Sequence, residues 1–120
     1  MKSIILIDDK STIGKVVEAY LKNDYNLIAF TNPLSALSWL QNGNLPDLII
    51  TDIRMSDMTG VELLHYLKNN LMFKDIPVII LSSEDSTSER IRLLDDGAVD
   101  YIVKPFNPLE LKVRIKKVIG

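Results

Sequence analysis

The stretch Leu48-Ile-Ile-Thr-Asp52 decides how the rest of this chain folds. Its apolar, β-branched residues are typical of a strand that is buried on both faces of a parallel sheet. Such a strand places its last residue, Asp52, at the edge of the sheet where open α/β folds bind ligands. A single strand-end carboxylate often belongs to a turn or a helix cap, so Asp52 needs support from other acidic residues at the same edge.

That support comes from a second apolar run, Ile4–Ile7, which ends in Asp8 and Asp9. Three carboxylates at neighbouring strand ends repel one another unless a cation lies between them. The alternative is local: Asp8 and Asp9, followed by Ser11-Thr12, are also residues that cap helices. The sequence therefore predicts either a cation site at this edge or a capped first helix.

Short β-branched runs and segments with helical spacing alternate along the whole chain. The runs predict five strands, at Ile4–Ile7, Leu27–Phe30, Leu48–Ile50, Val78–Leu81 and Tyr101–Val103. The other segments predict five helices: one through Ile13, Val16, Val17, Tyr20 and Leu21, one opened by Pro33 and closed by Gly43, one through Val61, Leu64 and Leu67, one over about Thr87–Asp96, and one that starts at Asn107-Pro108.

Five repeats of strand and helix predict a parallel sheet with helices on both faces, because each right-handed crossover carries a helix back across the sheet. No internal repeat or linker interrupts the pattern, so we expect residues 1–120 to form a single domain. We expect a flavodoxin-like α/β fold with the strand order 2-1-3-4-5. In that order the first and third strands are neighbours, which places Asp8 and Asp9 beside Asp52.

Composition excludes several classes of function. The 120 residues include 14 basic and 16 acidic side chains, and a net charge of -2 gives no general attraction to nucleic acid or to an anionic membrane. Without cysteine, neither disulfides nor thiolate metal sites can form, which favours a reducing cytoplasm. We also expect no membrane span and no signal peptide, and therefore a cytoplasmic protein.

Motifs at the ends of the predicted strands carry a family resemblance. In chain order they are Ile7-Asp8-Asp9, Asp52 followed by Met55-Ser56-Asp57-Met58-Thr59-Gly60, Ser82-Ser83, and Lys104-Pro105-Phe106. Together they resemble the receiver domain of two-component response regulators, and the resemblance covers essentially the whole chain. The sequence departs from that family at Ser56, where proline is usual, and at Ser82, where threonine is commoner.

The resemblance implies a role for each of these residues. Asp52 is then the phosphoacceptor, Lys104 and Ser82 act with it in phosphoryl transfer, and Ser82 and Tyr101 form a conformational switch. It further implies a cis bond between Lys104 and Pro105 and a magnesium or manganese ion held by Asp8, Asp9, Asp52 and the carbonyl of Arg54. Because magnesium keeps several waters, we expect direct bonds from Asp9 and Asp52 and a water-mediated one from Asp8.

The predicted function is that of a response-regulator receiver, which catalyses its own phosphorylation and dephosphorylation. Magnesium-dependent transfer from the phosphohistidine of a sensor histidine kinase, or from a phosphotransfer protein, would phosphorylate Asp52 and switch the face made by the fourth helix, fifth strand and fifth helix. The alternative is a receiver-shaped interaction module that is never phosphorylated. The chain is expected to be a free-standing regulator or the receiver part of a longer protein.

Simpler interpretations stand beside several of these roles. Lys104 could be a solvated loop lysine, and Tyr101 could be an ordinary core residue. His65, the only histidine, has no second ligand at helical spacing and is expected to be solvated on the third helix. The basic run of the last helix is expected to be a solvated face rather than a contact to nucleic acid; its residues are Lys112, Arg114, Lys116 and Lys117.

Polar residues of alternating sign on the fourth helix, fifth strand and fifth helix resemble the symmetric dimer face of OmpR-type transcriptional regulators. By that resemblance Arg90 meets Glu110, Asp100 meets Arg114 and Asp95 meets Lys116 of a second copy, around the apolar residues Ile91, Leu94 and Val113. We expect a weak homodimer that tightens on phosphorylation. The alternative is a solvated surface with Ile91 and Leu94 in the core.

Overall fold

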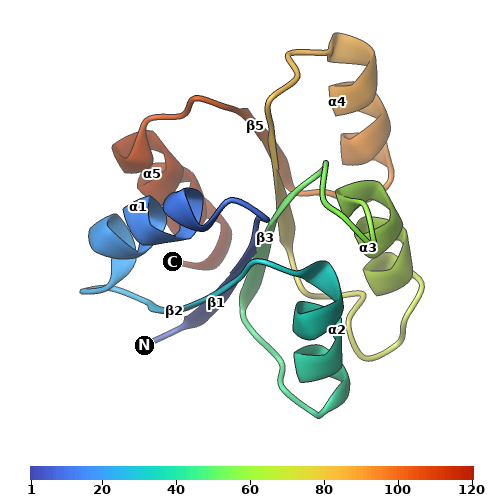
Figure 1. Ribbon diagram of the computed structural model, residues 1–120, viewed down its shortest axis with the longest axis horizontal. Helices are drawn as coiled ribbons and strands as arrows, with labels where there is room; N and C mark the ends of the chain where they lie inside the picture. Colours follow the sequence, from blue (N-terminus) through green and yellow to red (C-terminus); the bar gives the residue numbers. More distant parts are fainter.

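The computed structural model describes residues 1–120, in which five strands alternate with five helices (Figure 1). The strands are β1 (Ser3–Ile7), β2 (Asn26–Phe30), β3 (Leu48–Asp52), β4 (Val78–Ser82) and β5 (Asp100–Val103). The helices are α1 (Ser11–Leu21), α2 (Pro33–Gln41), α3 (Gly60–Lys68), α4 (Thr87–Asp95) and α5 (Pro108–Ile119). The ten elements predicted from the sequence are confirmed, with bounds that differ by one or two residues.

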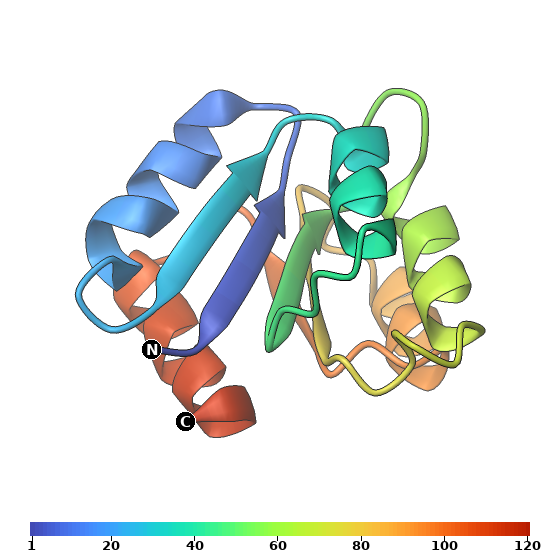
Figure 2. The same ribbon diagram turned by 90° about the horizontal axis from the view of Figure 1, so that it is seen from below.

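The sheet is parallel throughout and has the order β2-β1-β3-β4-β5, which confirms the flavodoxin-like prediction. In the register of the central pair, Ile7 lies opposite Thr51, so the residues after β1 lie beside the end of β3. The side view in Figure 2 shows β1, β2 and β3 ending at one edge of the sheet. The segments that carry the predicted site residues therefore start from a common edge.

Helices cover both faces of the sheet, with α1 and α5 on one side and α2, α3 and α4 on the other (Figure 1). Two cores result. One combines alternate residues of the strands with Val17 and Leu21 of α1 and Leu111 and Ile115 of α5. The other combines the opposite set of strand residues with apolar side chains of the three remaining helices. Burial on both faces explains why β3 and β4 are apolar without alternation.

Helix α1 buries less of its apolar stripe than helical spacing alone would suggest. It packs through Gly14, Val17 and Leu21, whereas Val16 and Tyr20 are 43% and 45% exposed. A Cβ atom at position 14 would lie 2.9 Å from the Cβ of Ala29, so the helix rests closely on β2. Because β2 is an edge strand, the support beneath α1 is narrow and the sides of the stripe stay in solvent.

No helix combines the length and hydrophobicity that crossing a bilayer requires.

Candidate functional site

Three carboxylates gather where β1 and β3 end, as the strand order predicts. Asp8, Asp9 and Asp52 each place a carboxylate oxygen so that the three atoms lie within 4.8 Å of one another. Asp8 and Asp52 are buried and Asp9 is exposed. The structure therefore brings together the three acidic residues that the sequence singled out.

Lys104 completes this cluster from the end of β5. Its Nζ lies 2.7 Å from Asp8 Oδ2 and 3.2 Å from Asp52 Oδ2, and its side chain is 14% exposed. The expected cis bond between Lys104 and Pro105 is present. Burial by itself would lower the pKa of the ammonium group, but the hydrogen bond to Asp8 and the charge of Asp52 outweigh burial and raise the pKa. The alternative of a solvated loop lysine is wrong.

Hydrogen bonds distinguish the three carboxylates from one another. Asp8 Oδ1 accepts the backbone N–H of Lys10 at 2.9 Å, so both of its oxygens are engaged. Asp52 Oδ1 accepts the N–H of Ile53 at 2.7 Å, which leaves Oδ2 toward Lys104. Asp9 makes no hydrogen bond or ion pair within the chain. Lys10 is the N-cap of α1 and no side chain caps that helix, so the helix-capping alternative for these residues is wrong.

The loop from Ile53 to Thr59 leaves β3 and returns to it at the start of α3. A Cβ atom at Gly60 would lie 2.2 Å from the carbonyl oxygen of Asp52, so only glycine fits there. The Gly60 N–H donates to the Ile53 carbonyl at 2.8 Å, and Thr59 forms a capping box with Glu62. This close return holds the first residues of the loop, including Arg54, beside Asp52.

Ser82 ends β4 next to this cluster and is buried. Its hydroxyl oxygen accepts the N–H of Glu84 at 3.0 Å, and its carbonyl accepts the N–H of Lys104 at 2.7 Å. Glu84 in turn contacts Arg54 as an ion pair that bridges the loops after β3 and β4. Opposite charges from these two loops are therefore in contact.

Tyr101 of β5 is buried, and its hydroxyl donates to the Glu84 carbonyl at 3.0 Å and to Glu89 Oε1 at 2.6 Å. Burial and the hydrogen bond to Glu89 raise the pKa of its hydroxyl. Glu89 belongs to α4, and sequence reasoning missed it because no local pattern relates it to a tyrosine twelve residues away. The ring is thus a core residue whose polar end ties β5 to α4.

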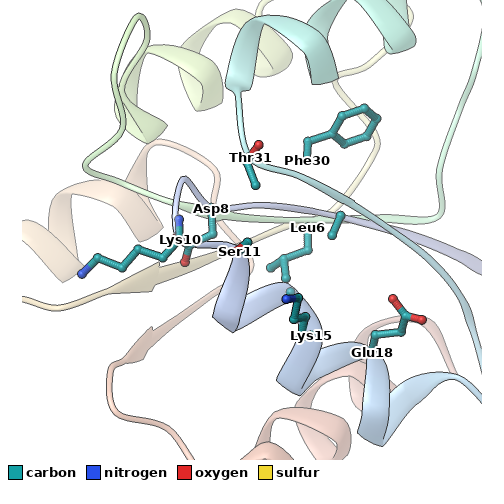
Figure 3. A pocket seen from close by; sticks show the side chains of 10 residues that line it. Leu6, Asp8, Lys10, Ser11, Lys15, Glu18, Phe30 and Thr31 are labelled. Carbon is teal, nitrogen blue, oxygen red and sulfur yellow. The ribbon is translucent and has the colours of Figure 1, made fainter.

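A cavity of about 210 Å³ adjoins the cluster on the side of α1 (Figure 3). Its floor is apolar, formed by Leu6, Ala29 and Phe30. The other labelled side chains in Figure 3 form its polar walls, namely Asp8, Lys10, Ser11, Lys15, Glu18 and Thr31. Asp8 therefore borders both the carboxylate cluster and an open cavity.

The surface of α4, β5 and α5 carries exposed apolar residues. Ile91 and Leu94 are 62% and 40% exposed, and Val113 is also exposed, so the alternative that places Ile91 and Leu94 in the core is wrong. Solvent reaches them because α4 packs on the sheet mainly through Leu93, its one buried residue.

The charged residues of this surface are paired mainly within the chain. Arg114 donates to both oxygens of Asp100 at 2.9 Å and to Glu110 at 3.3 Å, and Arg90 pairs with Asp85 at 3.6 Å. Asp95 and Lys116 form no ion pair. His65 is exposed on α3, as expected, and contacts Asp96 at 3.0 Å.

Comparisons with known proteins show the family to which this chain belongs. A family model described as the response regulator receiver domain matches residues 4–116. The chain is 37% identical to a histidine kinase, P4, of Formosa agariphila, over 98% of this chain and 8% of that protein. It is 35% identical to the phosphate regulon transcriptional regulatory protein PhoB of Escherichia coli, over 98% of this chain and 52% of that protein.

Among solved structures, the receiver domain of the Francisella response regulator 1452 superposes with a TM-score of 0.90 at 30% identity, covering 99% of this chain and 97% of that chain. The chain spans about half the length of PhoB and a small part of the kinase. Because the family model covers nearly all of the chain, this chain belongs to the receiver domain family of two-component response regulators.

Proposed function

We propose that this receiver domain is a phosphorylation-driven switch in which Asp52 accepts a phosphoryl group from a phosphohistidine. The donor is a sensor histidine kinase or a phosphotransfer protein of the cytoplasm. The observation that carries the proposal is the buried Asp52 carboxylate, which faces the Lys104 ammonium at 3.2 Å within a cluster of acidic residues. Such a constellation suits transfer of an anionic group onto a carboxylate.

The transfer itself requires one bond to form and one to break. A carboxylate oxygen of Asp52 attacks the phosphorus, and the bond from phosphorus to the donor nitrogen breaks with its electron pair left on that nitrogen. Lys104 is proposed to bind one phosphoryl oxygen, and the contact of its ammonium with the Asp52 carboxylate supports this role. The Ser82 hydroxyl and the Ser83 backbone N–H at the end of β4 are candidates to bind another.

The acidic cluster suits a magnesium or manganese ion. Its donors are hard carboxylate oxygens at one sheet edge, and the carbonyl of Arg54 follows Asp52 closely. Asp9 has a free carboxylate, whereas both oxygens of Asp8 are engaged, which supports direct ligation by Asp9 and Asp52 and a water-mediated role for Asp8. When bound, the ion supplies positive charge that offsets the approach of one anion to another.

Phosphorylation is proposed to act on the face of α4, β5 and α5 through Ser82 and Tyr101. Movement of the Ser82 hydroxyl toward a phosphoryl group would release its bond from the Glu84 N–H, and Glu84 also accepts from Tyr101 through its carbonyl. With the bond from Tyr101 to Glu89, these contacts connect Ser82 to α4. The proposed output is homodimerisation through that face.

Intact-mass measurement after incubation with magnesium and acetyl phosphate tests the assignment of Asp52. We expect wild type to gain one phosphoryl group and Asp52→Asn to gain none, because the amide keeps the shape of the side chain but is not a nucleophile. Circular dichroism should show the same fold for both proteins. Equal labelling of the two would refute the assignment of Asp52, and no labelling of either would favour the phosphorylation-independent interaction module.

A further inference from the structure

The sequence Asn-Pro-Leu occurs twice, at Asn32-Pro33-Leu34 and at Asn107-Pro108-Leu109, and both copies start a helix. In each copy the asparagine is the N-cap: Asn32 Oδ1 accepts the N–H of Leu34 at 2.8 Å, and Asn107 Oδ1 accepts that of Leu109 at 2.9 Å. Capping uses only the side-chain oxygen, and serine would supply an equivalent acceptor. The NH2 group of the asparagine side chain can therefore donate a second hydrogen bond.

Only one of the two asparagines uses that amide group. Asn32 Nδ2 donates to Asp57 Oδ2 at 3.2 Å, which joins the loop before α2 to the loop before α3. The Nδ2 group of Asn107 donates no hydrogen bond within the chain, and only its Oδ1 is engaged. Two identical local motifs thus differ in one contact, and that contact spans two loops beside the acidic cluster.

The acceptor of this bond, Asp57, has an unusual backbone. Its φ of 71° makes it the only residue other than glycine with a positive φ. The N–H of Met58 donates to the carbonyl of Ser56 at 2.8 Å, which is the hydrogen bond of a γ-turn centred on Asp57. With a positive φ this is the classic form of the turn, which is rare and strained. Some contact outside the turn has to favour it.

The strained turn belongs to the loop that carries Arg54, whose carbonyl is the proposed metal ligand. The loop is fixed at its start by the bond from the Ile53 N–H to Asp52 and at its end by the bond from the Gly60 N–H. Neither bond restrains the tip around Asp57. If Asp57 relaxes to a negative φ, the neighbouring peptide planes turn with it. The turn starts at Ser56, two residues after Arg54, so this change can reach the Arg54 carbonyl.

We propose that Asn32 is a positioning residue for the metal site. Its side-chain amide holds Asp57 in the strained turn, and the turn keeps the Arg54 carbonyl directed toward the acidic cluster. This inference rests on the proposed function, because it assigns Asn32 a part in building the magnesium site. Asn32 itself touches neither the ion nor the phosphoryl group.

Asn32→Ser and Asn107→Ser form a matched pair of variants that tests the proposal. Both keep a helix N-cap, both delete an amide group, and only Asn32→Ser removes the bond between loops. Calorimetric titration with magnesium chloride should show affinity reduced by roughly threefold to tenfold in Asn32→Ser and unchanged in Asn107→Ser. Thermal melts without magnesium should agree for the two variants. Equal magnesium affinities in the two variants overturn the proposal.

Asp57→Gly tests whether Asn32 acts through Asp57, because glycine adopts a positive φ without strain. In that background Asn32→Ser should cause no further loss of magnesium affinity. An equal loss in both backgrounds means that Asn32 does not act through Asp57, and the proposal fails.

Amide NMR separates this inference from the proposed function. Asn32→Ser should shift the backbone resonances of Ser56, Asp57 and Met58, whereas Asn107→Ser should not. If wild type binds no magnesium, the proposed metal site fails on its own and Asn32 cannot position it. Unmoved resonances in Asn32→Ser, with magnesium binding intact in wild type, overturn only the role of Asn32.

Discussion

Arg54 and Glu84, on the two loops beside Asp52, form an ion pair. Arg54 follows the proposed phosphoacceptor by two positions and Glu84 follows Ser82 by two. Their ion pair is partly exposed, with 71% of the Arg54 side chain accessible, so its contribution to folding is small. The pair joins the loops that follow β3 and β4, and we propose that it hinders a water molecule from attacking an acyl phosphate on Asp52.

We therefore expect Arg54→Ala and Glu84→Ala each to shorten the half-life of the phosphorylated protein. The double variant should decay no faster than the more affected single variant, because either substitution already breaks the pair. Intact-mass measurements at intervals after removal of acetyl phosphate would give the decay rates. Unchanged rates in both single variants would show that the pair does not screen the acyl phosphate.

At the level of secondary-structure elements, α4, β5 and α5 combine internal ion pairs with exposed apolar residues. Arg114 already binds Asp100 and Glu110 of its own chain. A symmetric dimer with Arg114 on the Asp100 of a second copy would exchange one set of pairs for another, which yields little net free energy. Burial of Ile91, Leu94 and Val113 would then supply most of the dimer's stability.

Ile91→Ser should accordingly weaken the dimer of the magnesium beryllofluoride form more than salt does. A two-fold axis removes both copies of the side chain from the interface, which costs about 1 to 2 kcal/mol, or roughly a fivefold to thirtyfold higher dissociation constant. Leu71→Ser is the matched control, because Leu71 is 85% exposed in the loop between α3 and β4. Sedimentation velocity measures the dimer. If wild type is a monomer at every concentration, this face does not form a homodimer and would bind a different partner.

The acidic cluster affects the free energy of unfolding of the whole domain. Asp8 and Asp52 are buried next to Asp9, and Lys104 is the only cation that contacts the two buried carboxylates. Without a metal, repulsion among the carboxylates opposes folding. A cation that binds only the folded state would shift the whole unfolding equilibrium by mass action.

Magnesium should therefore raise the melting temperature of wild type. At ten times the dissociation constant, binding adds about 1.4 kcal/mol, which corresponds to roughly 6 °C for a domain of this size. Asp9→Asn should lose most of this response, and Asp52→Asn should melt above wild type in EDTA because it has one charge fewer. Thermal melts with and without magnesium measure both effects, and an identical magnesium response in Asp9→Asn would exclude Asp9 as a ligand.

Local preferences along the chain were enough to predict the arrangement of elements. The β-branched run at Leu48–Asp52, the Asn-Pro start of α5 and the glycine after α4 are signals that act over a few residues, so they can be recognised without a structure. The strand order was expected from the flavodoxin-like fold that this succession of elements fits, and with it the meeting of Asp8 and Asp52. The family motifs added Lys104, which lies 96 residues from Asp8.

Tertiary structure alone decided how these elements meet. The place of β2 at the sheet edge leaves Val16 and Tyr20 of α1 exposed, and the path of two loops joins Asn32 to Asp57 although Asn107 has the same local sequence. The partner of Arg114 also comes from within the chain. The physical reason is that a sequence pattern records what a segment prefers by itself, whereas burial and side-chain pairing depend on which distant segment the fold places against it.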